Sequence, residues 1–295
     1  MCIWENAVVM KKVLILGKGS YLGEQFQTWL NLYPEEYYVR MIGTKDGEWK
    51  KEEFAKYDCV VNFSGLAHIK NITPDMEEAF YSVNRDLAIE MGKWAKKCGV
   101  KHFVHLSSMN VYGDANNNII DRNQTAPTSF YGDSKLQGEI GLQQLATEGF
   151  VVSCVRPPFV YGSGCKGNYN LVRKLALKLP IFPTYKNKKS MIYVDNLSEF
   201  IRLTIDARAG GTFTPQNKEL VSTAELVKEI SRANGHKILF VGVFDWLMPL
   251  AKKISGMARK AFGDDCYCEE LSGYYEWKYC VVNFKDSIEL TEGKR

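Results

Sequence analysis

The sequence has no run of about 18 consecutive apolar residues, so it predicts no helix that crosses a membrane. Residues 238–250 come nearest, but this segment is too short and is interrupted by Asp245. For this segment we favour a helix that is buried or packed on the protein surface over peripheral contact with a membrane. The first ten residues contain Glu5 and lack the apolar core of a signal peptide, so we expect a cytoplasmic protein.

Patterns typical of metal sites, disulfide frameworks and nucleic-acid binding are also lacking. None of the eight cysteines forms a C-x-x-C pair accompanied by histidine at ligand spacing, so the sequence predicts no metal site. Cys59 and Cys154 lie in apolar runs, which is typical of reduced thiols in the core of a cytosolic protein. A net charge of +4 on 295 residues is too small to indicate a nucleic-acid partner.

Short β-branched runs alternate with helical patterns, which is typical of βαβ units and a parallel sheet. We therefore predict an α/β protein with a doubly wound Rossmann sheet and a smaller, mixed α/β C-terminal lobe that binds substrate. The dinucleotide-binding domain is expected over residues 11–162, with a returning segment near 190–215, and the lobe over most of 163–295. The expected strands are 12–16, 38–42, 59–63, 103–107 and 151–155, and the expected helices are 21–30, 80–98, 131–145 and 223–233.

A glycine-rich turn, Gly17 to Gly23, follows the first strand and opens the first helix. Glycines allow a tight turn and let the backbone approach a pyrophosphate, whose charge the helix N-terminus stabilises. Glycine spacing alone is equally compatible with a simple turn, but its position between strand and helix predicts a dinucleotide site.

Tyr131 and Lys135 are four residues apart on an expected helix and therefore share one face. An ammonium near a phenol, whose ordinary pKa is about 10, favours the phenolate and lowers that pKa. Ser107 and Ser108 end the fourth strand, on the edge where open α/β sheets bind ligands. Either feature alone occurs often by chance, so the prediction of an acid/base site depends on their combination.

Together these motifs resemble the extended short-chain dehydrogenases/reductases, specifically the nucleotide-sugar epimerase/dehydratase family. The resemblance covers most of residues 11–205 and includes segments 62–65, 156–162, 166–168 and 190–196. It implies that Ser108, Tyr131 and Lys135 are the catalytic residues. It also implies that NAD or NADP is bound by Gly17, Gly19, Ser20, Tyr21, Leu22, Gly23, Asp46, Phe63, Ser64, Gly65, Asn84, Ser107, Tyr131, Lys135, Pro158 and Val160.

Two departures from the family pattern bear on the cofactor. Ser20 stands where the family usually has the middle glycine of the turn, so its hydroxyl is expected near the pyrophosphate. NAD-binding members usually carry an acidic residue at the end of the second strand, where this chain has Gly43. Asp46 follows, while Arg40 and Lys45 lie nearby, so the choice between NAD and NADP stays open.

Residues 149–194 contain no acidic residue but eight lysines and arginines, which predicts an anionic ligand such as a nucleotide diphosphate. A solvated basic face is the simpler alternative, and nucleic acid is disfavoured because aromatic residues are not interleaved. By the resemblance, Lys189 stands where the family often places a diphosphate-binding arginine. The substrate is expected to contact Ser108, Met109, Asn110, Lys166, Asn168 and Lys189.

The resemblance thus implies an NAD(P)-dependent enzyme acting on a UDP-sugar in surface-polysaccharide precursor synthesis. A 4,6-dehydratase is disfavoured, because Met109 and Asn110 replace the Asp-Glu pair that follows the catalytic serine or threonine in such enzymes. We favour a UDP-hexose or UDP-N-acetylhexosamine 4-epimerase over a UDP-4-keto-6-deoxy-sugar reductase. A non-catalytic dinucleotide sensor is a more remote alternative, and a homodimer is compatible with the family.

Overall fold

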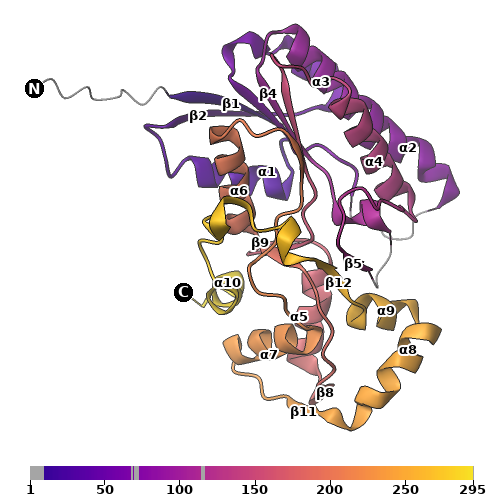
Figure 1. The fold of residues 1–295 in the computed structure, drawn as a ribbon. Coiled ribbons are helices and arrows are strands. Elements are labelled where there is room, and N and C mark those ends of the chain that lie inside the picture. The colour runs from indigo at the N-terminus through magenta and orange to yellow at the C-terminus, as the bar shows by residue number, and fades with distance from the viewer. Residues whose placement is uncertain (1–9, 68, 70–72, 114–116, 295) are drawn as a thin grey trace, which may run out of the picture.

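The computed structural model describes residues 10–67, 69, 73–113 and 117–294. Its centre is a six-stranded sheet in which every pair of neighbouring strands is parallel, in the order β10-β6-β4-β3-β1-β2 (Figure 1). This arrangement confirms the predicted α/β fold class. The strands are β1 (Lys11–Leu16), β2 (Tyr37–Ile42), β3 (Cys59–Asn62), β4 (His102–Leu106), β6 (Val151–Val155) and β10 (Gly211–Phe213).

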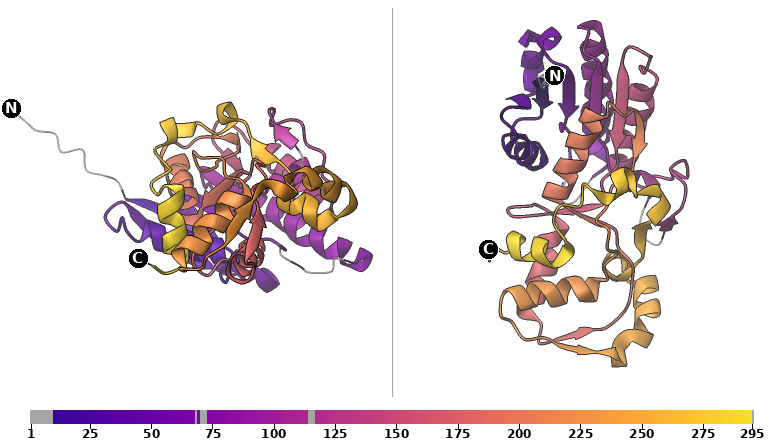
Figure 2. Two further views of the ribbon diagram at one scale, coloured as in Figure 1. Left: turned by 90° about the horizontal axis from the view of Figure 1, so that it is seen from below. Right: turned by 60° about the vertical axis from the view of Figure 1, so that its left-hand side comes forward.

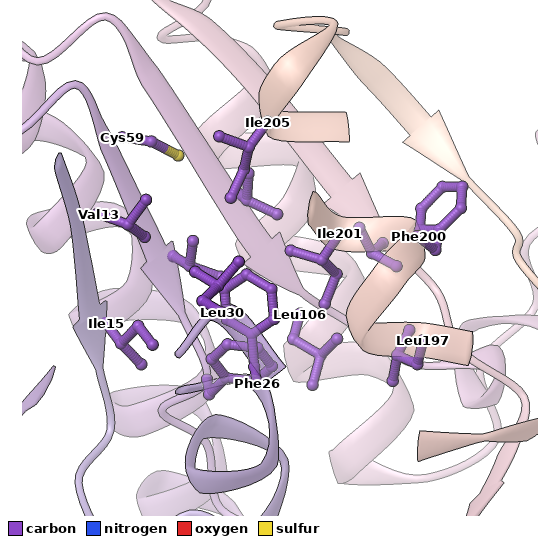
Figure 3. Packing of buried hydrophobic residues seen from close by; sticks show 14 of the residues in the cluster. Val13, Ile15, Phe26, Leu30, Cys59, Leu106, Leu197, Phe200, Ile201 and Ile205 are labelled. Carbon is purple, nitrogen blue, oxygen red and sulfur yellow. The ribbon is translucent and has the colours of Figure 1, made fainter. Parts of the chain in front are cut away.

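The central strands are almost wholly apolar because both faces of the sheet are covered by helices. Side chains alternate across β1, so Val13 and Ile15 pack on one face, while Leu14 and Leu16 pack on the other. Figure 3 shows the first face, where the sheet packs against helices α1 and α6. Helices α3 and α4 cover the second face. These helices are α1 (Tyr21–Leu30), α6 (Val194–Asp206), α3 (Ala88–Lys97) and α4 (Phe130–Gln143).

The long helix expected over residues 80–98 is interrupted by a stretch of π-helix, η4 (Ser82–Leu87), between α2 (Glu77–Tyr81) and α3. Helix α4 packs directly on this stretch, with Gly138 against the backbone of Asn84. The π-helical stretch therefore lies where α4 contacts Asn84, a residue that the sequence analysis expects in the cofactor site.

A second lobe lies beyond the carboxyl ends of the strands (Figures 1 and 2). It is built from short parallel strand pairs and from helices that bury a separate apolar cluster. Its strand pairs are β7 (Phe159–Tyr161) with β9 (Met191–Tyr193), β8 (Ile181–Pro183) with β11 (Leu239–Val241), and β5 (Asn117–Ile119) with β12 (Asp265–Tyr267). Its helices are α5 (Asn168–Lys178), α7 (Thr223–Ala233), α8 (Met248–Ile254), α9 (Gly256–Phe262) and α10 (Phe284–Thr291).

Short 3-10 helices connect these elements. They are η1 (Lys45–Lys51), η2 (Phe54–Lys56), η3 (Pro74–Met76), η5 (Met109–Tyr112), η6 (Gly242–Leu247), η7 (Glu269–Leu271) and η8 (Tyr274–Trp277). Within the described ranges, no helix is long and apolar enough to cross a membrane, and no three potential metal ligands form a cluster. The seven cysteines that the structure describes are free thiols.

Candidate active site

The glycine-rich turn forms a cradle between β1 and α1. Gly17 has φ +114°, and a Cβ there would lie 2.9 Å from the backbone nitrogen of Ser64. Gly19 also has positive φ, and a Cβ there would meet no described atom within 4 Å. The first glycine is therefore required by close packing, while the second borders open space beside the helix N-terminus.

Helix α1 begins at Tyr21, and the hydroxyl of Ser20 caps it by accepting a hydrogen bond from the backbone of Gly23 at 3.5 Å. The N–H groups of the first helical turn, including those of Tyr21 and Leu22, have no intrahelical partner. The Tyr21 hydroxyl is buried and has no hydrogen-bond partner among the described residues. Unpaired donors at a helix N-terminus beside open space fit a pyrophosphate, so this cradle fits a dinucleotide.

The residues at and after the end of β2 are those that the sequence analysis relates to cofactor choice. A side chain at Gly43 would meet no described atom within 4 Å, so this position borders open space. Asp46 is exposed in a left-handed conformation with φ 56°. Arg40 forms an ion pair with Glu52 at 2.7 Å, so its charge is already balanced within the protein. Lys45 is exposed in the same segment, so its pairing with a 2′-phosphate stays a prediction.

The segment after β3 faces the same cradle. Phe63 is buried, and its ring packs against Phe26 at 5.6 Å between centroids. The Ser64 hydroxyl donates to Thr44 Oγ1 at 3.1 Å and links the ends of β3 and β2. A Cβ at Gly65 would lie 2.8 Å from Lys135 Nζ. Gly65 therefore allows the side chain of Lys135 to approach this loop.

Ser107 and Ser108 follow β4 as predicted, but their hydroxyls have different partners. The Ser107 hydroxyl donates to Glu139 on α4. The Ser108 hydroxyl lies 3.3 Å from Asn110 Oδ1 and accepts from the backbone of Asn110 at 3.2 Å. The Ser108 side chain also lies close enough to Tyr131 to lower the pKa of that phenol. Of the two serines, Ser108 is therefore the one that shares a site with the tyrosine.

Tyr131 lies in the first turn of α4, and burial raises its pKa above the ordinary value. The Ser108 side chain acts in the opposite direction and offsets part of this shift in the Tyr131 pKa. The expectation that Lys135 lowers the pKa of Tyr131 is thus wrong for this arrangement. Desolvation of the buried phenol exceeds any stabilisation of the phenolate in the site as it stands.

Lys135 is 4% exposed, and its ammonium donates to the carbonyl of Leu106 at 3.0 Å. Burial lowers its pKa to about 8, and the nearby carboxylate of Glu139 acts in the opposite direction. The ammonium therefore lies between the end of β4 and the Gly65 loop, where a bound dinucleotide would pass.

Asn84 positions this loop from the π-helical stretch. Its amide oxygen accepts from the backbone of Leu66 at 2.8 Å, and its amide nitrogen donates to the carbonyl of Leu66 at 3.1 Å. The same nitrogen donates to Ser134 on α4 at 3.1 Å. Asn84 therefore joins the β3 loop to α4, the helix that carries Tyr131 and Lys135.

The sequence interpretation missed a buried ion pair close to the predicted catalytic residues. Arg156 contacts Glu139 through several hydrogen bonds, the shortest at 2.6 Å, and both side chains are almost fully buried. Arg156 also donates to the hydroxyl of Tyr112 at 2.7 Å, and its carbonyl accepts from Tyr267 of the second lobe at 2.9 Å. Glu139 is four residues after Lys135, so its place on the same face of the helix could be predicted, but its pairing with Arg156 could not.

The residues expected at the substrate are distributed around the lobe. Lys166 and Asn168 are exposed at the start of α5, and Asn110 is exposed after β4. Met109 packs against the cluster that contains Val111 and Tyr267. On the cofactor side, Pro158 is buried and Val160 packs in the core.

Three cations of the acid-free stretch have counterions from distant parts of the chain. Arg156 pairs with Glu139, Arg173 with Glu292 and Lys189 with Asp265, the last at 3.0 Å. The charge of Lys189 is therefore balanced by β12, which weakens its assignment to a substrate diphosphate. A local absence of acids does not exclude tertiary partners, and this is why the sequence overstated the excess of positive charge.

The sequence is similar to a known protein family and to individual proteins whose functions are named. Residues 34–214 match the sequence profile of the NAD dependent epimerase/dehydratase family. The chain is 30% identical over 209 residues to a UDP-glucose 4-epimerase from Vibrio cholerae, covering 67% of this chain and 63% of that protein. It is 28% identical over 216 residues to an N-acetyl-alpha-D-glucosaminyl-diphospho-ditrans,octacis-undecaprenol 4-epimerase from Escherichia coli O157:H7, covering 70% and 63%. The matches thus span just under two thirds of each relative.

Solved structures share the fold at lower identity. A UDP-glucuronic acid 4-epimerase from Bacillus cereus superposes with a TM-score of 0.73 at 14% identity, over 96% of this chain and 98% of the other. A dTDP-4-dehydrorhamnose reductase from Bacillus anthracis, in complex with NADP, gives 0.67 at 20% identity over 97% and 98%. These likenesses confirm the fold, and they include both an epimerase and a reductase.

Proposed function

The chain belongs to the NAD dependent epimerase/dehydratase family, and we propose that it is a UDP-sugar 4-epimerase acting on a UDP-hexose or UDP-N-acetylhexosamine. The observation that carries this proposal is the shared site of Ser108, Tyr131 and Lys135 beside the Gly17–Gly23 cradle. Both curated relatives described above are named as 4-epimerases, which supports C4 of the sugar as the reacting carbon.

In this proposal the nicotinamide dinucleotide, when bound, supplies the hydride acceptor and donor. Tyr131 removes the proton of the sugar hydroxyl at C4 and returns it after the 4-keto sugar has turned over. Ser108 holds the same oxygen by its hydroxyl, since its side chain already acts on the Tyr131 phenol. Lys135, as a buried cation beside Gly65, favours the phenolate once the site is filled and holds the cofactor ribose.

The site does not suit a 4,6-dehydratase. That reaction needs an acid and a base directly after Ser108, and the residues there are Met109 and Asn110. The side chain of Met109 packs into an apolar cluster, and Asn110 has no ionisable group. Water cannot be removed from the sugar by either residue.

A UDP-4-keto-6-deoxy-sugar reductase is the second candidate, because the same three residues would protonate a C4 oxygen once without returning the proton. Gly43 favours this alternative to a limited extent, since no acidic side chain there repels NADPH. The purified protein distinguishes the two functions. Tightly bound NAD with interconversion of UDP-sugar C4 epimers supports the epimerase. An empty cradle with NADPH consumed by a 4-keto sugar supports the reductase.

A role in surface-polysaccharide precursor synthesis, a cytoplasmic location and a homodimer complete the proposal. We include the homodimer because dimers are common in the family. Sedimentation equilibrium of the purified protein tests it, and we expect twice the mass of the chain.

A further inference from the structure

The second lobe ends in a surface far from the Rossmann sheet. It consists of β8, β11, η6 and α8, which we call the lobe tip (Figures 1 and 2). Strands β8 and β11 pair in parallel, and η6 packs against β8 and leads directly into α8. No residue of α8 is buried among those whose side chains the structure describes.

The lobe tip exposes large apolar side chains. Ile254 is 77% exposed, Trp246 74% and Val243 66%, and these are the three most exposed large hydrophobic side chains in the described part of the chain. Leu250 is 55% exposed and lies between them at helical spacing. Residues 243, 246, 250 and 254 thus form one apolar stripe along η6 and α8, and this stripe faces solvent instead of the core. Leu239 and Ile181, which are partners in the β11–β8 register, are exposed on the same tip.

Positive charge surrounds this stripe. Residues 230–263 contain six lysines and arginines but one acidic residue, Asp245. The carboxylate of Asp245 accepts from the Thr184 hydroxyl at 2.6 Å, and its other oxygen is buried, so it adds little negative charge to the surface. The segments that form or directly adjoin the lobe tip expose six cations, namely Lys178, Lys186, Lys237, Lys253, Arg259 and Lys260.

Apolar side chains at helical spacing with flanking lysines and arginines form the surface that an anionic bilayer binds. With seven residues, α8 is far too short to cross the hydrocarbon layer, so it suits the interface. A second copy of the chain is a poorer occupant, because two such tips would bring like charges together. We propose that the lobe tip docks on the surface of anionic phospholipid membranes, with Trp246 and Ile254 inserted among the headgroups.

This docking goes beyond the proposed function and does not depend on which reaction the site catalyses. Trp246 has the aromatic, amphipathic side chain that is enriched at the level of lipid headgroups. The segment 238–250, for which we favoured a buried or surface-packed helix, is therefore assigned to peripheral membrane contact. Sequence alone could not decide this, because it does not show that the apolar stripe faces outward.

Sedimentation of the full-length protein with lipid vesicles tests the proposal. Vesicles of phosphatidylcholine alone are compared with vesicles that also contain phosphatidylglycerol. We expect binding to the anionic vesicles, weakened by salt because exposed charges are screened. The double substitution Trp246→Ser with Ile254→Ser should lower the partition coefficient by at least about tenfold, since two large apolar side chains leave the interface. Lys253→Gln with Lys260→Gln should lower it by roughly fivefold per charge.

Leu32→Ser is the matched control, because Leu32 is 63% exposed but lies after α1 in the Rossmann domain. It should leave vesicle binding unchanged, and dinucleotide binding confirms that each variant is folded. The proposal is overturned if the wild-type protein stays in the supernatant with both kinds of vesicle. It is also overturned if the Trp246/Ile254 variant binds vesicles like wild type while its mass in lipid-free buffer falls, since the tip would then contact a second copy.

Discussion

Gly43 is the residue that leaves cofactor choice open. Its neighbourhood has room for a side chain, and its φ is not in the left-handed region, so an aspartate fits there without strain. Arg40, one candidate for a 2′-phosphate, is already paired with Glu52. We therefore expect wild type to bind NADH and NADPH with modest discrimination, within about tenfold.

Gly43→Asp should shift this preference toward NADH by at least about tenfold, or roughly 1.4 kcal/mol, because its carboxylate repels the 2′-phosphate and accepts from the ribose hydroxyls. Titration calorimetry with both reduced dinucleotides measures the ratio. Gly43→Asn is the control, since it has similar volume and no charge. An unchanged ratio in the aspartate variant would show that the cofactor ribose lies elsewhere.

Glu139 has two roles. It pairs with Arg156, and its carboxylate opposes the lowering of the Lys135 pKa that burial causes. Glu139→Gln should lower the free energy of unfolding by about 3–5 kcal/mol, because Arg156 is left as a buried charge without a counterion. Urea denaturation measures this loss. Replacing both partners, as Glu139→Leu with Arg156→Met, should cost clearly less than the single change. Equal costs would mean that the pair is not a coupled buried unit.

At the scale of elements, the contact between α4 and the π-helical stretch η4 positions the site. A Cβ at Gly138 would lie 2.5 Å from the backbone oxygen of Asn84, so the two helices can approach only because this residue is glycine. Asn84 in turn holds the Leu66 loop against the catalytic helix.

Gly138→Ala should therefore destabilise the protein by about 1–3 kcal/mol, the usual cost of overpacking, and should weaken dinucleotide binding as Asn84 shifts. Gly149→Ala serves as the control, because a Cβ there meets no described atom within 4 Å and φ is not positive. Thermal unfolding and calorimetry of both variants provide the comparison. If the two variants behave alike, the α4–η4 contact does not position the loop.

The five expected strands lie within one residue of the observed ones, because each is a short run rich in apolar and β-branched residues, and β3, β4 and β6 are almost wholly buried. The π-helical stretch was not predictable, since it depends on a tertiary contact with Gly138. Strand pairs such as β5 with β12 join segments of three residues that lie far apart in the chain, and such short segments have no periodicity to read.

In the candidate site, too, some residues could be predicted from the sequence and others could not. Tyr131 and Lys135 could be found from their four-residue spacing and Ser108 from its place at a strand end. Arg156 was visible in the sequence, but its role depends on Glu139, which only the fold brings beside it. The counterions of Lys189 and Arg173 were hidden for the same reason.

At the scale of the whole molecule, two buried histidines on β4 make stability depend on pH. Burial lowers the pKa of His102 to about 4 and that of His105 well below its ordinary value. Both bind protons more readily in the unfolded chain, so stability is fully present above about pH 6.5 and falls as pH decreases. Each histidine contributes about 1.4 kcal/mol per pH unit in that window.

The free energy of unfolding should thus fall by about 3–4 kcal/mol between pH 7 and pH 5. Urea denaturation across this range measures the slope, and His102→Gln should roughly halve it. An identical slope in that variant would mean that His102 does not stay neutral in the folded protein.

The proposed 4-epimerase activity depends on Tyr131 performing reversible acid/base chemistry at C4 of a UDP-sugar. The most direct test is incubation of the protein with UDP-glucose or UDP-N-acetylglucosamine carrying deuterium at C4. We predict the C4 epimer with the deuterium retained, no net consumption of cofactor, and a loss of about 10²–10⁴-fold in rate for Tyr131→Phe, while Tyr38→Phe on the surface keeps full activity. The proposed function would be contradicted if neither sugar gave its C4 epimer. It would also be contradicted if Tyr131→Phe formed the epimer at an unchanged rate.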